Sequence, residues 1–111
     1  MWFVETPGRP HDLHQPRPAL VISADIRNAL RDHVIVVPIF SSGRLGPTRV
    51  ALSAGTGGLD HDGVVFCDEV TTLHHRFMGA RPLGPRVPGR ILKEVVKAIR
   101  RAVGDLVAET D

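Results

Sequence analysis

The chain has 111 residues, enough for one domain with a single hydrophobic core. Its one cysteine excludes a disulfide framework and a thiolate metal cluster, and no apolar stretch reaches the roughly 20 residues that a membrane-spanning helix needs. We therefore expect a single cytoplasmic domain over residues 1–111, without a signal peptide or membrane contact. The net charge is only +2, but residues 76–101 hold eight basic side chains against Glu94 alone. Such segregation can attract a polyanion or an acidic peptide, although a solvated helix face explains part of it.

Three strands are predicted in the first part of the chain. The first covers residues 2–5, and a loop rich in Pro, Gly and His separates it from "ALVIS", residues 19–23. Residues 24–33 have a weak helical pattern, sufficient for a single turn. "VIVVPIF", residues 34–40, is the strongest strand signal. Pro38 within it cannot donate to a β-ladder, so we expect an edge position or a bulge there.

Two further strands follow along the chain. They are "RVALS", residues 49–53, and "VVFCDEV", residues 64–70, joined by a turn-rich connection. "TTLHHRFMG", residues 71–79, is expected to form a helical turn. Together with the earlier elements, this pattern predicts five short strands before the C-terminal region.

One long amphipathic helix is predicted at the end of the chain, with Gly89 as an acceptable N-cap. Apolar residues recur at i, i+3, i+4 and i+7 from Ile91 to Val107, and Gly104 weakens the last turn by about 1 kcal/mol relative to Ala. The strands lack crossover helices between them, which argues against a parallel sheet. We therefore expect a mainly β fold, an SH3-like small barrel or roll with a C-terminal helix.

The histidines do not form a recognisable metal site. His11 and His14 are three residues apart in a loop, and His61, His74 and His75 follow without the spacing of zinc ligands. We expect neither a metal nor another cofactor. Histidines in exposed loops can instead contact phosphate groups when they are protonated.

The stretch "QPRPALVIS" places Arg17 between two prolines at the start of an apolar strand. Prolines restrict the backbone, so Arg17 is presented at a fixed position. Cys67 falls in a predicted buried strand, where a thiol behaves as a small hydrophobe, and the chain has no nucleophile elbow or phosphate-binding glycine loop. The remaining groups, arginines and hydroxyls, suit polarisation of a phosphodiester. From the residues alone, however, a pair between Arg17 and a nearby carboxylate is the favoured explanation.

The motifs "RPALVIS", "VVPI" and "VVFCDEVTT", in this order and at these intervals, resemble the MazF/PemK family of toxin endoribonucleases. The similarity runs from Trp2 to about residue 107. It implies a homodimeric barrel that binds single-stranded RNA in a groove and is restrained by an antitoxin protein with an acidic disordered tail. It also implies cleavage without a metal, in which the 2′-hydroxyl of the RNA attacks the adjacent phosphate and leaves a 2′,3′-cyclic phosphate and a 5′-hydroxyl.

The resemblance assigns the catalytic arginine of the "RP" motif to Arg17. The family's second catalytic residue, a Thr or Ser directly after "PI", is replaced here by Phe40. We expect Ser41 to supply the hydroxyl, with Ser42 a close alternative because a regular strand would orient Ser42 like Phe40. An irregularity at Pro38 could bring Ser41 to the site. The alternative function is a catalytically weakened barrel that binds RNA or an antitoxin.

Loop residues complete the expected site. Arg9, His11 and His14 lie in the loop that covers the groove in relatives, and Arg44 and Arg49 flank the loop after the third strand. Contacts of these residues with phosphate groups would give affinity with little sequence preference. Phe40 could stack on a base, although we expect it in the core.

Overall fold

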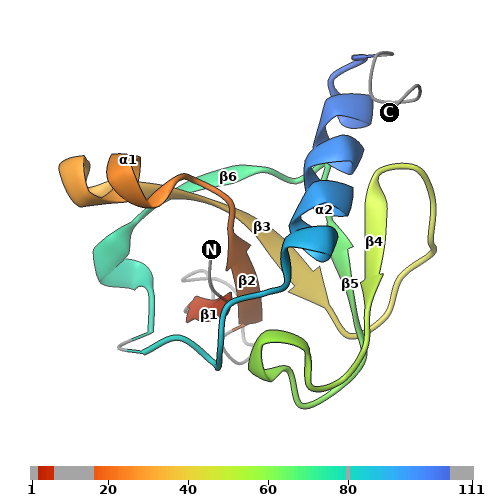
Figure 1. Cartoon of the computed structure of the whole chain (residues 1–111), viewed down its shortest axis with the longest axis horizontal. Helices are drawn as coiled ribbons and strands as arrows, with labels where there is room; N and C mark the ends of the chain where they lie inside the picture. The colour runs from red at the N-terminus through yellow and green to blue at the C-terminus, as the bar shows by residue number, and fades with distance from the viewer. Residues whose placement is uncertain (1–2, 7–16, 80, 106–111) are drawn as a thin grey trace, which may run out of the picture.

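The computed structural model describes residues 3–6, 17–79 and 81–105 (Figure 1). Six strands form one antiparallel sheet, and the longest helix lies across it. The elements in chain order are β1 (Phe3–Thr6), β2 (Arg17–Val21), α1 (Asp25–Leu30), β3 (His33–Phe40), β4 (Arg49–Leu52), η1 (Thr56–Gly58), β5 (Gly63–Phe66), β6 (Thr71–His74), η2 (His75–Phe77) and α2 (Gly89–Ala102). This arrangement confirms the mainly β class with a C-terminal helix.

Strand β3 is the centre of the sheet. The strand order is β1-β2-β3-β5-β4, and β6 pairs with the first half of β3. On the side opposite β2, residues 33–36 of β3 pair with β6 and residues 39–40 pair with β5. Pro38 falls between these two partners, where a missing N–H group costs no ladder hydrogen bond on that side. The expected edge position is therefore wrong, because β3 has neighbours on both sides.

The two faces of the sheet bury different clusters, as the alternation of side chains along a strand requires. One face packs against α2, and its largest fully buried side chains include Leu20, Val37 and Val65 from the sheet and Val95 from the helix. The opposite face carries a smaller cluster with Met78 packed against it. The buried members of that cluster are Ala19, Val21, Val34 and Val36.

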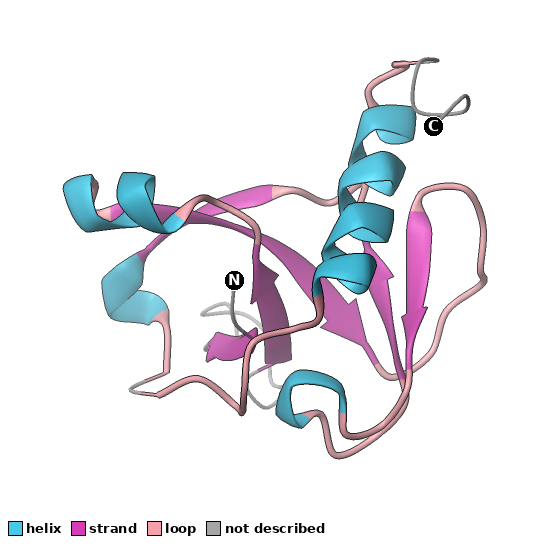
Figure 2. Ribbon diagram, in the orientation of Figure 1, coloured by secondary structure: helices cyan, strands magenta, loops and turns pink. Residues whose placement is uncertain are grey.

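Residues 71–79 differ from the expected helical turn. Residues 71–74 form strand β6, and only residues 75–77 form a helical turn, of the 3-10 type (Figure 2). The reason is tertiary, because β6 gains a ladder with β3 in the register His33↔His74 to Val36↔Thr71. The preceding strand, β5, ends at Phe66 rather than at residue 70.

The ends of α2 also differ from expectation. Pro88 is the N-cap residue and Gly89 is already helical. The helix ends at Ala102, and Gly104 adopts a positive φ of 81° outside it. The backbone N–H groups of Gly104 and Asp105 donate to the carbonyls of Arg101 and Arg100, the pattern of a Schellman ending. The glycine therefore terminates the helix instead of weakening its last turn, and residues 106–107 lie outside the described residues.

A buried polar network attaches α1 to β3. Ser23 is 5% exposed, and its hydroxyl donates to Asn28 Oδ1 at 2.6 Å and accepts from the Ile35 N–H at 3.0 Å. Asn28 Nδ2 donates in return to the Ser23 carbonyl. All of these groups find partners, as buried polar groups require. The helix itself is only six residues long, close to the single turn expected.

Candidate active site

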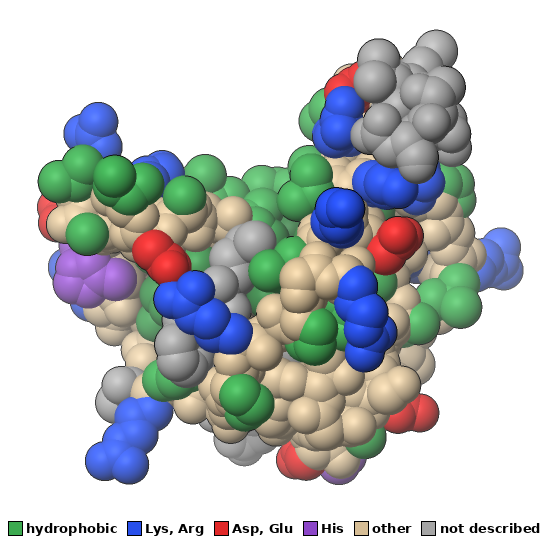
Figure 3. Space-filling model, viewed as in Figure 1, with side chains coloured by type: hydrophobic (Ala, Val, Ile, Leu, Met, Phe, Trp, Pro, Cys, Tyr) green, Lys and Arg blue, Asp and Glu red, His purple; other side chains and the backbone are tan. Residues whose placement is uncertain are grey.

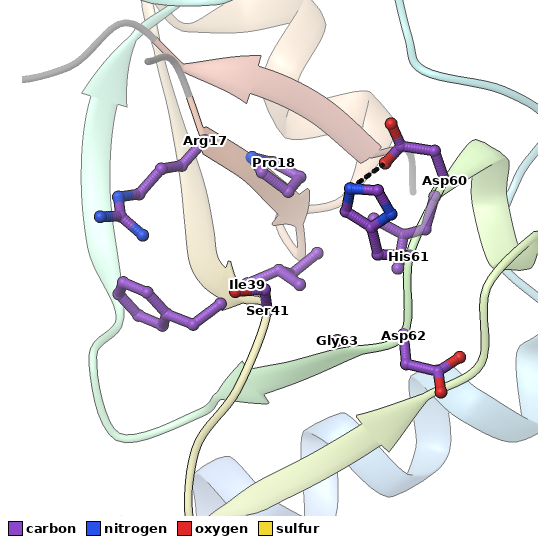
Figure 4. A pocket seen from close by; sticks show the side chains of 10 residues that line it. Arg17, Pro18, Ile39, Ser41, Asp60, His61, Asp62 and Gly63 are labelled. Atoms are coloured by element: carbon purple, nitrogen blue, oxygen red, sulfur yellow. Dashed lines mark ion pairs between the residues drawn. The ribbon is translucent and has the colours of Figure 1, made fainter. Parts of the chain in front are cut away.

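The ends of three neighbouring strands lie close together at one end of the sheet. Because these strands are antiparallel, the start of β2, the end of β3 and the start of β5 lie side by side there. A pocket of about 160 Å³ opens there, which is smaller than a typical pocket for a whole small molecule and suits one segment of a larger ligand. The lining residues are Arg17, Pro18, Ile39, Phe40, Ser41, Leu59, Asp60, His61, Asp62 and Gly63 (Figure 4).

The Arg17 side chain lines one side of this pocket and gives that side a positive charge. Its side chain is half-buried, and its Cζ atom lies 5.0 Å from the centroid of the Phe40 ring. The sheet dictates this contact, because the register Ala19↔Pro38 continues to place Arg17 opposite Phe40 on the same face. A guanidinium over an aromatic ring gains about 0.5–1 kcal/mol when it is partly exposed. The aromatic contact therefore helps to fix the orientation of the arginine.

Ser41 lines the same pocket and Ser42 does not. Both serines are exposed. Strand β3 ends at Phe40, so the alternation of side chains that would favour Ser42 does not extend beyond this residue. The structure thus brings Arg17 and Ser41 together, while a catalytic role for either serine stays a prediction.

The opposite wall of the pocket comes from the loop before β5, which the sequence did not indicate as part of the site. In Figure 4, His61 and Asp60 lie across the pocket from Arg17. Their side chains are mostly exposed, and His61 Nε2 lies 3.9 Å from Asp60 Oδ1. Asp62 Oδ1 accepts from the Ala54 N–H at 2.8 Å and so anchors the loop. The available signal was the segment "DHD", three titratable residues in a turn-rich connection, but its position beside Arg17 depends on the topology.

A close backbone contact holds this loop in place. Gly58 has φ +94°, a conformation that glycine adopts without strain, and a Cβ atom at this position would lie 2.3 Å from the Leu83 carbonyl oxygen. Any larger residue would push the loop away from the segment that leads to α2. The loop that carries residues 60–62 is therefore held at two points, by Gly58 against Leu83 and by the hydrogen bond between Asp62 and Ala54.

Arg44 and Arg49 lie beyond the pocket, in and after the loop that follows β3. Arg49 begins β4, and its Cζ atom lies 3.8 Å from the centroid of the Phe66 ring. Its Nη1 donates to the Arg44 carbonyl at 2.9 Å. The Phe40 and Phe66 rings are 4.5 Å apart, and both are half-buried, so Phe40 is not the core residue we expected. The expected RNA-binding residues Arg9, His11 and His14 lie outside the described residues.

The titratable groups of the described residues offer little to a metal. No group of three or more His, Cys, Asp and Glu side chains in this part of the chain could hold one. Burial, and secondarily the charge of Asp68, raises the pKa of the Cys67 thiol to about 12, so this thiol stays protonated. His74 packs against the rings of His33 and His75, and desolvation together with the neighbouring His75 lowers its pKa.

Comparison with known proteins identifies the family. A family model described as "PemK-like, MazF-like toxin of type II toxin-antitoxin system" matches residues 1–104. Endoribonuclease PemK from Escherichia coli is 32% identical over 98 residues, which are 86% of this chain and 73% of the relative.

Solved structures agree with this assignment. The toxin MazF-mt6 of Mycobacterium tuberculosis has a TM-score of 0.77 at 24% identity, covering 93% of this chain and 96% of that chain. A MazE-MazF structure from Deinococcus radiodurans also has a TM-score of 0.77, at 28% identity, and covers 93% of this chain and 92% of that chain. These likenesses confirm the expected fold. On the family match over nearly the whole length and the identity to a named endoribonuclease, the chain belongs to the PemK-like, MazF-like toxins of type II toxin-antitoxin systems.

Proposed function

We propose that this protein is a toxin that cleaves single-stranded RNA without a metal, at the pocket between Arg17 and Ser41. The observation that carries the proposal is the placement of a guanidinium and a hydroxyl in one small pocket of a chain that belongs to an endoribonuclease family. A planar guanidinium binds a phosphate through two parallel hydrogen bonds. A neighbouring hydroxyl adds a third donor to the same group.

The proposed reaction uses the RNA's own nucleophile. The 2′-oxygen bonds to the adjacent phosphorus and the bond from phosphorus to the 5′-oxygen breaks, which yields a 2′,3′-cyclic phosphate and a 5′-hydroxyl. The 2′-hydroxyl loses its proton and the leaving 5′-oxygen gains one. Arg17 and Ser41 stabilise the charge on the phosphorane oxygens, a contribution that is large when the donors are held in place beforehand. The aromatic contact of Arg17 provides such positioning.

His61 is a candidate for proton transfer in this reaction. Imidazole is the side-chain type that exchanges protons near neutral pH. His61 lines the pocket on the side opposite Arg17, so it would approach a bound phosphodiester from another direction than the guanidinium. The carboxylates of residues 60 and 62 repel phosphate, so binding depends on cations elsewhere on the surface.

We further propose a homodimer that is restrained by an antitoxin with an acidic disordered tail. One Deinococcus relative is described as a MazE-MazF structure, and one mycobacterial relative as an endoribonuclease in complex with its cognate antitoxin. In this chain Lys and Arg side chains gather over α2, on the face shown in Figure 3, and could attract an acidic segment. Some of them already have partners, because Arg100 pairs with Asp105 at 2.9 Å. We place the protein in the cytoplasm; its described part contains no helix long and apolar enough to cross a membrane.

One observation favours a second candidate function. By the motif resemblance, Phe40 stands at the position where the family has a Thr or Ser, so the hydroxyl expected there is absent. A barrel with this change could bind RNA or an antitoxin while cleaving RNA poorly. Both candidate functions include binding of RNA, and they differ in the rate at which the bound RNA is cleaved.

The test is cleavage of a mixed single-stranded RNA pool by the purified chain in excess EDTA. The proposal expects new 5′-hydroxyl ends and matching 2′,3′-cyclic phosphate ends, and no cleavage of a 2′-O-methyl version of the same RNA. Cleavage that EDTA abolishes, or 5′-phosphate products, would contradict the chemistry. Binding of the RNA without any cleavage would favour the second candidate. Sequencing the 5′-hydroxyl ends would also identify the RNA motif and the class of RNA attacked.

A further inference from the structure

Two arginines and two phenylalanines form a row across the sheet, with the phenylalanines in the middle and one arginine at each end. Arg17 lies over Phe40, the Phe40 and Phe66 rings are 4.5 Å apart with an angle of 53° between their planes, and Arg49 lies over Phe66 at 3.8 Å. We call this set of four the Arg–Phe row. Each contact is within the range of a cation–π or aromatic pair. The row is therefore continuous from the pocket to the start of β4.

The strand registers explain why these side chains share one face. Arg49 pairs directly with Phe66, and Phe40 pairs with Val64, which places Phe66 diagonally across from Phe40. With Arg17 opposite Phe40, the row crosses β2, β3, β5 and β4, the order of these strands in the sheet. Three strand spacings give it a length of about 14 Å. It lies on the face opposite the one that α2 covers.

All four side chains of the row are half-buried, so part of each contacts solvent. The loop after β3 is held close to the row, because a Cβ atom at Gly43 would lie 2.8 Å from the Phe66 ring. Exposed Ala51, next along β4 on the same face as Arg49, adds only a methyl group beside the row. Among the described residues, the neighbours Gly43 and Ala51 leave the row partly open, because neither has a side chain larger than a methyl group.

The surface has the composition that binds unpaired nucleobases. Single-stranded RNA is recognised by stacking of bases on aromatic rings and on guanidinium planes, with cations following the backbone. The Cζ atom of Arg49 lies over the Phe66 ring at 3.8 Å, and the half-buried side chain keeps part of the guanidinium accessible to a base. The row begins at Arg17, where the scissile phosphate is proposed to bind.

We propose that the Arg–Phe row is a stacking platform for the bases next to the scissile phosphate, so that Arg49 acts by stacking and not only by charge. This inference rests on the proposed function, because it takes single-stranded RNA as the ligand. It differs from the phosphate contact expected for Arg49 from the sequence, which a lysine would supply equally well.

The experiment compares two probes that cannot be cleaved. One is a short 2′-O-methyl RNA and the other is the same strand with abasic sites at its central positions; both are titrated with the purified chain by fluorescence anisotropy. Stacking contributes about five- to hundred-fold in affinity per base, so the wild type should bind the first probe at least about five-fold more tightly. Arg49→Lys, which keeps the charge, should lose this preference with an unchanged salt slope. Phe66→Leu should lose it too.

The control is Arg31→Lys, an exposed arginine directly after α1, which should retain wild-type affinity for both probes. Thermal melting checks that each variant is folded. Equal affinity of wild type and Arg49→Lys for the base-containing probe, or an equal loss on both probes, would overturn the platform and leave the row a structural feature. If the wild type binds neither probe, both this inference and the proposed function are wrong. If it discriminates the probes but does not cleave unmodified RNA, only the proposed function is wrong.

Discussion

Replacement of Arg17 by lysine separates its proposed role in the reaction from its role in the fold. Lysine keeps the positive charge but has neither the planar guanidinium nor its paired donors. In the fold, one interaction that the change weakens is the partly exposed contact with Phe40, at 5.0 Å, which is worth about 0.5–1 kcal/mol. For a domain of this size, that cost lowers the melting temperature by about 2–6 °C. In the reaction, loss of a positioned donor to the phosphorane lowers kcat by about 10²–10³.

The assay is kcat/KM on a fluorogenic single-stranded RNA, measured well below the melting temperature of each variant. Arg86→Lys is the matched control, because Arg86 is an exposed arginine paired with Asp25 at 2.7 Å, outside the residues that line the pocket. It should cost no activity. A rate for Arg17→Lys within a few-fold of wild type would refute the proposed role. So would a loss of activity that only follows unfolding, since the arginine would then be structural.

Three other changes test the site and the interior. Ser41→Ala should lower the cleavage rate by about a hundred-fold in the same assay and Ser42→Ala by less than about two-fold; the reverse result would show that our hydroxyl assignment is wrong. Ser23→Ala leaves the Ile35 N–H without its acceptor and should lower the free energy of unfolding in urea by about 1–3 kcal/mol; a change near zero would mean that water replaces the hydroxyl. Cys67 should react with a thiol reagent near neutral pH only after unfolding, because burial raises its pKa from 9.0 to about 12. The raised folded-state pKa also means that its contribution to stability is complete below about pH 9 and is lost as pH rises towards 12, and rapid labelling of the native protein would contradict this.

The sequence predicts those parts of the fold whose local pattern agrees with their tertiary environment. The run of β3 is rich in β-branched residues, and the predicted bounds of β2, β3 and β4 agree with the structure to within a few residues. Residues 71–74 were missed because their strand conformation depends on pairing with β3, which local propensity does not report. The sequence pattern places Gly104 inside α2, where it would weaken the last turn, whereas its positive φ terminates the helix.

The residues of the candidate site also fall into two groups, those that the sequence indicates and those that only the tertiary structure brings to the pocket. The resemblance to the family motif points to Arg17 and Ser41, and both line one pocket, whereas the residues alone favour a carboxylate pair for Arg17. His61 and its neighbours could not be selected from the sequence, since only the β4–β5 connection folding back beside β2 brings them to the pocket. The stacking of Arg49 on Phe66 was equally hidden, because it depends on a cross-strand register and not on spacing along the chain.

The family motif and the structure suggest different roles for Phe40. Compared with the family motif, it is a missing hydroxyl and suggests a weakened enzyme. In the sheet, it is the partner directly opposite Arg17, and its ring holds the guanidinium whose orientation the proposed chemistry needs. A threonine here would offer a hydroxyl but no ring for the arginine, while the adjacent Ser41 already brings a hydroxyl to the same pocket. Under the proposed function, Phe40 therefore orients the arginine, and the hydroxyl comes from the adjacent Ser41. On this view Phe40 also links the pocket to the Arg–Phe row, so that positioning of the phosphate and stacking of the bases depend on the same ring.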